Sequence, residues 1–306
     1  MPSDQASLEE LFANFLKRHK LAESFAETAR EWFIPLAEDL SLHHISAGGT
    51  LFVGVNGTQG SGKSTLCDFL LEYLTTLHGL HVISLSLDDF YFSSAKRAEL
   101  AESVHPLLAT RGVPGTHDVT RMQQTFEALA AQDVPVTIPR FNKATDNPYE
   151  QSEWLVVDKP VDIVFMEGWC WGITSQESAA LVEPVNTLEA YEDIDAKWRD
   201  HVNVSLKNDY EPLYDYMHYW VMLLAPGFSA VYAWRCEQEQ KLRDKLRKQN
   251  AATDELDGVM TDEQIARFIA HYQRLTEHGL ATLPDTCDTV FELDRQRQIM
   301  AARLGD

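Results

Sequence analysis

The sequence predicts an α/β protein with a doubly wound, mainly parallel sheet of five strands, helices on both faces and an N-terminal helical extension. Five short apolar segments alternate with segments of helical apolar spacing. A glycine-rich turn joins the first of these strands to an amphipathic helix, and carboxylates end two later strands. The 306 residues suffice for one large domain or two modest ones.

Residues 1–48 are expected to form the helical extension, and residues 49–306 the main domain. Within residues 7–41 apolar side chains recur at the spacing of an amphipathic helix, which predicts two helices. The pair Gly48 and Gly49 ends this pattern and separates it from the first strand.

The five strands are short apolar runs bounded by glycines or polar residues. The run at 161–166 is continuous, which is typical of a central parallel strand that is buried on both faces. In chain order the expected strands are Thr50–Val55, His81–Leu87, Val161–Met166, Tyr219–Leu224 and Thr289–Leu293.

The segments between the strands carry helical signals. The first has one apolar face and ends before Gly79, and the last begins at Thr261 with Gln264 three residues later, a capping box. The helices are expected at Ser64–Leu77, Ser94–Glu102, Arg121–Ala131, Tyr191–Val202, Phe228–Arg247 and Thr261–Glu277.

The composition is strongly acidic, with 26 Lys+Arg against 47 Asp+Glu and a net charge of −21. Such a surface repels phosphate backbones and anionic lipid, so we expect no nucleic-acid or membrane partner. The four cysteines are far apart without a C-x-x-C motif, which favours reduced thiols. No secretory signal or long apolar run is found, so the expectation is a soluble cytoplasmic protein.

The turn after the first strand matches the phosphate-binding pattern G-x-x-x-x-G-K-S/T. Glycines let backbone N–H groups turn inward around a phosphate, and the following helix adds its positive N-terminal end. Lys63 is expected to meet the β- and γ-phosphates, and Ser64 to ligate Mg²⁺. The nine residues expected to bind nucleotide are Gly57, Thr58, Gln59, Gly60, Ser61, Gly62, Lys63, Ser64 and Thr65.

Carboxylates follow two of the other strands. Glu167 ends the strand at 161–166 and is expected beside Ser64 as the second metal ligand. Asp88 ends the second strand, where a kinase needs a group to accept or orient the acceptor's hydroxyl proton. Asp89 belongs either to the site or to the cap of the next helix. Trp169 and Trp171 either wall the pocket or pack in the core.

A GTPase is rejected. Its guanine motif, Asn-Lys-x-Asp, is off by one residue in the segment Asn142 to Asp146, which also precedes the acidic strand instead of following it.

Four motifs occur along the chain in the order GTQGSGKST, SLDDFY, Pro-Arg-Phe and FMEGW. With these motifs the chain resembles the P-loop small-molecule kinases, which include uridine kinase, pantothenate kinase and phosphoribulokinase. DDFY, RGVPGTHD, MEGW and YAWRCEQE resemble the D-glycerate 3-kinase branch. The resemblance runs from Phe52 to Leu293. It implies a P-loop kinase sheet that uses ATP and Mg²⁺.

The resemblance also implies residue roles. Asp88 matches the catalytic base of the relatives. Arg235 falls in a lid region, about residues 228–260, that brings an arginine to the transferring phosphoryl group. The alternative for Arg235 is a surface residue of an amphipathic helix, and most other basic residues of this segment suit a solvated face.

The acceptor pocket is expected between the second strand and the acidic strand. Arg111 and Arg140 are candidate anion anchors, because a guanidinium can meet a carboxylate with two parallel hydrogen bonds. Asp89 and Tyr91 of the DDFY segment are placed with the acceptor. His117 either binds an acceptor hydroxyl or forms a structural pair with its neighbouring aspartate.

These observations predict a Mg²⁺-ATP-dependent kinase that phosphorylates a hydroxyl of a small metabolite, with D-glycerate the first candidate. One alternative is a kinase of another small alcohol, such as a nucleoside or a pantothenate-like compound. A second is a non-catalytic ATP-binding regulatory protein, which would need neither Asp88 nor Arg235.

Overall fold

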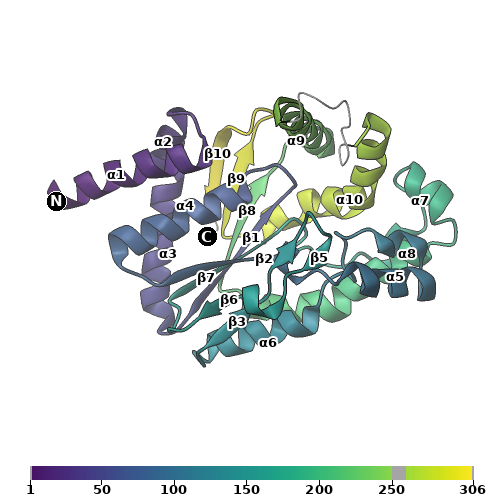
Figure 1. Cartoon of the computed structure of the whole chain (residues 1–306), viewed down its shortest axis with the longest axis horizontal. Coiled ribbons are helices and arrows are strands. Elements are labelled where there is room, and N and C mark those ends of the chain that lie inside the picture. Colours follow the sequence, from purple (N-terminus) through teal and green to yellow (C-terminus); the bar gives the residue numbers. More distant parts are fainter. Residues whose placement is uncertain (1, 250–259, 305–306) are drawn as a thin grey trace.

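The computed structural model describes residues 2–249 and 260–304, and a six-stranded sheet forms its centre (Figure 1). The strand order is β10-β9-β8-β1-β7-β2, and all neighbours are parallel except β10, which runs antiparallel to β9. The strands are β1 Leu51–Gly57, β2 Val82–Ser86, β7 Ile163–Gly168, β8 Tyr219–Leu224, β9 Thr289–Leu293 and β10 Ile299–Leu304. The α/β class and all five predicted strands are confirmed.

The sheet has six strands, one more than the five that the sequence predicts. Strand β10 was not predicted, because this edge strand mixes polar and apolar residues and its side chains are exposed or half-buried. Two small antiparallel ladders were also missed, each with strands of only two or three residues. They pair β3 Val136–Ile138 with β6 Leu155–Val157, and β4 Phe141–Asn142 with β5 Asn147–Pro148.

Helices cover both faces of the sheet, and each face has its own apolar core. Helices α1, α3 and α4 pack on one face, whereas α6, α8 and α10 pack on the other. The helices are α1 Pro2–His19, α2 Ser24–Thr28, α3 Ile34–Ala47, α4 Lys63–His78, α5 Ser94–Ser103, α6 Val119–Ala130, α7 Thr187–Glu192, α8 Lys197–Ser205, α9 Phe228–Gln249 and α10 Asp262–Thr282.

The helix predicted at Tyr191–Val202 is wrong. The chain forms α7 and α8 instead, because the buried Asp193 carboxylate separates them. This carboxylate accepts hydrogen bonds from the backbone N–H groups of Trp198 and Arg199 and pairs with the Arg199 guanidinium at 2.9 Å. A buried carboxylate is stable only with such partners, so it ends one helix and caps the next.

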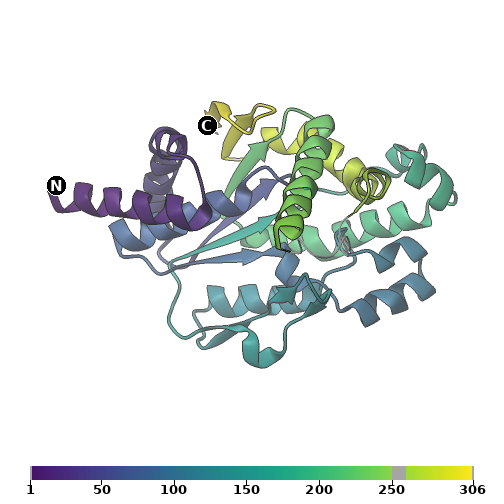
Figure 2. The ribbon, with the colours of Figure 1, turned by 45° about the horizontal axis from the view of Figure 1, so that its top comes forward.

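The N-terminal helices lie at one end of the molecule, with α7 and α8 at the other (Figures 1 and 2). Edge-on aromatic contacts join Phe15 of α1 and Phe25 of α2 to Phe69 of α4, with centroid distances of 5.5 and 5.8 Å. The extension therefore shares a core with the phosphate-loop helix. The division at residue 48 stays a prediction, and residues 250–259 of the predicted lid lie outside the described part of the chain.

Within the ranges described above, no helix is both long and apolar enough to cross a membrane. All four cysteines are free, and Cys67, Cys170 and Cys287 are buried.

The sheet register brings separated motifs to one edge. Strand β7 lies between β1 and β2, so Glu167 is paired in register with Val55 of β1 and Ser86 of β2. Because parallel strands end at the same edge, the phosphate loop, Glu167 and Asp88 converge there, as expected for a doubly wound sheet.

Candidate active site

The phosphate loop connects β1 directly to α4, and its shape requires glycine. Gly60 and Gly62 have φ of +80° and +98°, in the left-handed region that side chains disfavour. A Cβ atom at Gly60 would lie 3.0 Å from the Cβ atom of Trp234, so α9 packs directly against the loop. The loop also buries Thr58 Oγ1 and Ser61 Oγ, which have no hydrogen-bond partner among the described residues. Such atoms suit a site that binds a polar ligand.

Lys63, Ser64 and Glu167 meet at the start of α4. Ser64 Oγ donates a hydrogen bond to Glu167 Oε1 at 2.9 Å, and Lys63 Nζ lies 3.5 Å from Glu167 Oε2. Burial lowers the pKa of Lys63, but the nearby carboxylates of Glu167 and Asp88 outweigh it and raise the pKa above its usual value. Lys63 is therefore a half-buried side chain that is positively charged at neutral pH.

A hydroxyl and a carboxylate are ligands of the type that Mg²⁺ prefers, so Ser64 and Glu167 fit this metal. In the described ranges no group of three or more His, Cys, Asp or Glu side chains could hold a metal ion. A magnesium ion here would therefore need oxygens from a nucleotide or water, which is its usual mode of binding in phosphoryl-transfer sites.

Asp88 follows β2 in a short 3₁₀ turn, and two donors hold its carboxylate. Tyr91 Oη donates to Oδ1 at 2.9 Å, and Lys143 Nζ donates to Oδ2 at 2.5 Å. Burial raises the pKa of Asp88, but the charges of Lys143 and Lys63 outweigh it and lower the pKa below its usual value. Asp88 is thus ionised at neutral pH and can accept a hydroxyl hydrogen.

Sequence reasoning gave Lys143 no role beside Asp88. Its position just after the Pro-Arg-Phe segment was the only signal, and the contact joins residues 55 positions apart.

Asp89 faces a different partner. Its Oδ2 accepts a hydrogen bond from Arg140 Nη1 at 2.7 Å, and its Oδ1 accepts one from the Phe141 backbone N–H at 3.2 Å. Asp89 does not cap α5, because Ser93 does so by accepting from the Lys96 backbone N–H. Burial raises the pKa of Asp89 even though Arg140 opposes it.

Arg111, the other candidate anion anchor, pairs with the Asp146 carboxylate, which also binds Arg97. The Arg111 guanidinium lies 5.7 Å from the centroid of the Phe141 ring. Both candidate anion anchors therefore have carboxylate partners that restrain them, and their role toward a substrate stays a prediction.

His117 is buried beside the Asp88 turn. Its ring stacks on Tyr91 with centroids 4.4 Å apart, and its Nδ1 lies 2.6 Å from Tyr210 Oη. Burial lowers the pKa of His117 to about 3, so the ring is neutral. A pair with Asp118 is wrong, because that side chain caps α6 by accepting from the Arg121 backbone N–H. Among the residues described, His117 Nε2 has no hydrogen-bond partner.

Arg235 lies on α9, next to Trp234, the residue that packs on Gly60. It pairs with the buried Glu239 at 2.7 Å, and its guanidinium lies 5.4 Å from the Phe268 ring centroid. Arg235 is therefore held by its own helix and α10.

Trp169 and Trp171 are both buried in the core, which favours the packing interpretation over a pocket wall.

A cavity of about 360 Å³ adjoins the predicted metal ligands, and its lining includes Ser64, Ser86, Arg140 and Glu167. This volume is within the range of small-molecule sites.

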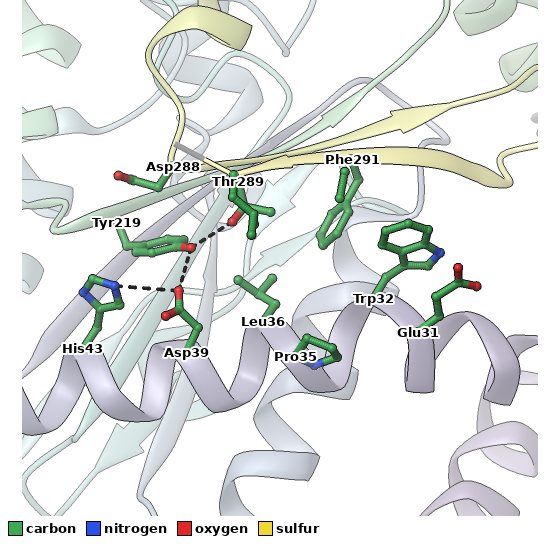
Figure 3. Close-up of a pocket in the computed structure, with 12 residues that line it drawn as sticks. Glu31, Trp32, Pro35, Leu36, Asp39, His43, Tyr219, Asp288, Thr289 and Phe291 are labelled. Carbon is green, nitrogen blue, oxygen red and sulfur yellow. Dashed lines mark hydrogen bonds and ion pairs between the residues drawn. The ribbon is translucent and has the colours of Figure 1, made fainter. Parts of the chain in front are cut away.

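A different cavity, of about 680 Å³, lies between α3 and β8 to β10 at the opposite edge of the sheet (Figure 3). None of the predicted site residues lines it.

No family model matches the chain. It is 32% identical over 246 residues to the uncharacterized kinase mug58 of Schizosaccharomyces pombe, a match that covers 77% of the chain and 83% of that protein. A solved structure of D-glycerate 3-kinase from Cryptococcus neoformans is 28% identical with a TM-score of 0.67, covering 84% of this chain and 90% of that one. The chain belongs to the glycerate-kinase-like branch of the P-loop kinases.

A plant relative supports the same family. This kinase is 29% identical over 244 residues to the chloroplastic D-glycerate 3-kinase of Arabidopsis thaliana, which covers 76% of the chain. The kinase spans only 48% of the length of that plant protein.

Proposed function

We propose that this kinase transfers the γ-phosphoryl group of ATP, with Mg²⁺, to a hydroxyl of a small hydroxy acid, with D-glycerate the first candidate. The observation that carries the proposal is the Asp88 carboxylate after β2, which accepts hydrogen bonds from Lys143 Nζ at 2.5 Å and Tyr91 Oη at 2.9 Å. The charges of Lys143 and of Lys63 of the phosphate loop lower its pKa. The names of the plant and Cryptococcus relatives support D-glycerate as the acceptor.

The phosphate loop would bind the ATP phosphates, with Lys63 placed for the β- and γ-phosphates. Ser64 and Glu167 would hold Mg²⁺, which when bound neutralises charge on the phosphate oxygens. Arg235 would add a further positive charge from the lid helix after releasing Glu239.

Asp88 would act on the acceptor hydroxyl. As its oxygen attacks the γ-phosphorus, the O–H proton passes to Asp88 and the bond from phosphorus to the bridging oxygen of ADP breaks. The products are a phosphomonoester and ADP, and Asp88 then loses the proton to water. Tyr91 orients the carboxylate, since its hydroxyl holds one carboxylate oxygen.

Arg140 would bind the carboxylate of the acceptor. It lines the same cavity as Ser64 and Glu167, and its side chain is 38% exposed while Asp89 holds one of its nitrogens. A guanidinium fixed on one side can still offer donors to a carboxylate on the other.

The proposal is tested by ATP consumption with D-glycerate, L-glycerate, glycerol, uridine and pantothenate as acceptors. Turnover with D-glycerate and little with glycerol, which lacks the carboxylate, is expected. Turnover with uridine or pantothenate alone would assign another acceptor. Tight ATP binding with no acceptor-dependent turnover would instead indicate a regulatory protein.

We also propose that this kinase works in the cytoplasm without a nucleic-acid or membrane partner. The net charge of −21 supports the absence of such partners, because an acidic surface repels phosphate backbones and anionic lipid. The four free cysteines support the cytoplasm, where thiols stay reduced.

A further inference from the structure

Lys143, at the tip of the β4–β5 hairpin, contacts the proposed base. Its Nζ donates to Asp88 Oδ2 at 2.5 Å, and Asp88 is its only ion-pair partner among the residues that the structure describes. We propose that Lys143 determines acceptor specificity, because its ammonium group binds the carboxylate of an acceptor whose hydroxyl lies on Asp88. The inference rests on the proposed function and adds a residue that selects acidic over neutral acceptors.

The backbone that carries Lys143 is fixed on both sides of the turn. Asn142 Oδ1 accepts a hydrogen bond from the Ala144 backbone N–H at 3.0 Å, which closes a turn around Lys143. The Asp146 carboxylate then pairs at 2.7 Å with the buried Arg97 guanidinium. The hairpin therefore holds the Lys143 backbone in place, while the exposed side chain can adjust to a ligand.

The contact between Lys143 and Asp88 leaves hydrogen-bonding capacity on both groups. An ammonium group has three N–H donors, and each carboxylate oxygen has two lone pairs. Lys143 uses one donor on Oδ2 of Asp88, and Tyr91 Oη donates to Oδ1 at 2.9 Å. Asp88 can therefore still accept the hydrogen of an acceptor hydroxyl, and Lys143 can offer two donors to a second group.

The dimensions of a small hydroxy acid fit this pair. In D-glycerate the terminal hydroxyl oxygen and the carboxylate oxygens are roughly 3–5 Å apart, because two carbon atoms with bonds of about 1.5 Å separate the hydroxyl from the carboxyl carbon. Two donors that share one carboxylate oxygen lie roughly 4 Å apart. A hydroxyl on Asp88 thus brings the carboxylate of the same molecule within reach of Lys143.

Two other cations of the site have partners that do not receive the acceptor hydroxyl. Arg140, proposed above as an anchor for the same carboxylate, is held by Asp89 at 2.7 Å, and Lys63 lies 3.5 Å from Glu167. Lys143 differs from both, because its partner is the proposed base and it therefore meets the reacting end of the acceptor. A carboxylate there would form a charge-assisted hydrogen bond, whereas a neutral acceptor would leave the two donors to water.

A role in holding Asp88 alone makes a different prediction. Asp88 acts on the hydroxyl of every acceptor, so the loss of Lys143 would then slow transfer to all acceptors by the same factor. A role in recognition instead slows transfer to the acidic acceptor more than to its neutral analogue. The ratio of the two rates therefore separates recognition from support of the base.

D-Glycerate and D-glyceramide, its neutral amide of similar shape, provide this comparison. Lys143→Met keeps an unbranched apolar side chain and removes the charge. It should lower kcat/KM for D-glycerate by about tenfold or more relative to kcat/KM for D-glyceramide, as expected for one hydrogen bond between charged groups. Lys143→Arg restores the charge and should recover most of the preference. Lys96→Met removes an exposed lysine of α5 that pairs with Glu99, and should change neither value.

The outcomes distinguish this inference from the proposed function. If Lys143→Met lowers kcat/KM for both acceptors by the same factor, or leaves both unchanged, the inference is overturned and the proposed function stands. If the unmodified kinase consumes no ATP with D-glycerate or with D-glyceramide, both proposals fail.

Binding provides a second measurement that does not depend on turnover of the amide. Calorimetry of D-glycerate with the kinase, Mg²⁺ and a non-hydrolysable ATP analogue should give a dissociation constant about tenfold or more higher for Lys143→Met than for the unmodified protein or Lys96→Met. Equal dissociation constants for the three proteins would overturn the inference.

Discussion

Replacing Asp88 with Asn tests the proposed base. The aspartate accepts one hydrogen bond on each oxygen, from Tyr91 at 2.9 Å and from Lys143 at 2.5 Å. Asparagine has one acceptor oxygen, so one of these donors loses its partner. The side chain of Lys143 is 62% exposed and can turn to water, so the cost in folding free energy should be about 1 kcal/mol.

The effect on catalysis should be far larger. An amide cannot take the acceptor proton, and general-base assistance contributes about 10²–10⁴ in rate, or about 2.7–5.4 kcal/mol in activation free energy. Turnover should fall by that factor, whereas the ATP dissociation constant should change little because the phosphate loop is intact. Initial rates with saturating acceptor and calorimetry with ATP measure the two effects.

Asp89→Asn is the control. Asp89 holds Arg140 and the Phe141 backbone, so its loss should raise the acceptor KM more than it lowers kcat. If Asp89→Asn lowers kcat more than Asp88→Asn does, the two roles exchange. If neither variant slows phosphoryl transfer, positioning alone drives the chemistry and the base assignment is refuted.

Three further results are expected. Lys63→Ala should weaken Mg²⁺-ATP binding or abolish turnover without unfolding the protein, as calorimetry and thermal denaturation would show; full activity would remove Lys63 from the site. Arg140→Lys keeps the charge but loses the planar fork, so the acceptor KM should rise by roughly 10- to 150-fold, from about 1.5–3 kcal/mol for a charge-assisted bond. Equal changes in the ATP KM would place Arg140 in the nucleotide site or the general fold. The lowered pKa of Asp88 means that its stabilising charge is present above about pH 4 and is lost as pH falls through the folded-state pKa. The rate should therefore be insensitive to Asp88 ionisation from pH 6 to 8, and an acidic limb near neutrality that Asp88→Asn removes would contradict this.

The sheet could be predicted because its signal is local. Apolar runs such as 161–166 predict buried strands by themselves, and the phosphate-loop pattern fixes the junction between β1 and α4. The edge strand β10 and the break at Asp193 could not be predicted in this way. The first lacks a buried face, and the second depends on the burial of a carboxylate with Arg199.

The site was predictable where a motif specifies it and less so where distant residues meet. Ser64 and Glu167 come together as expected, because the strand that ends in Glu167 pairs directly with the strand that leads into the phosphate loop. The partners of Asp88, His117 and Arg235 were not predicted. Lys143 and Tyr210 reach Asp88 and His117 from distant segments, and no spacing in the sequence specifies these two contacts. The pair of Arg235 and Glu239 has the i,i+4 spacing of a helix, which was the signal that could have predicted it.

Asp88 and the phosphate loop are proposed to form a phosphoryl-transfer site. A single-turnover reaction with γ-³²P-labelled ATP and D-glycerate, with Asp88→Asn run in parallel, follows the transferred group itself. The label should pass from ATP to phosphoglycerate in the unmodified kinase, and about 10²–10⁴ times more slowly in the variant. Label that remains in ATP, or that appears only as inorganic phosphate, would contradict it.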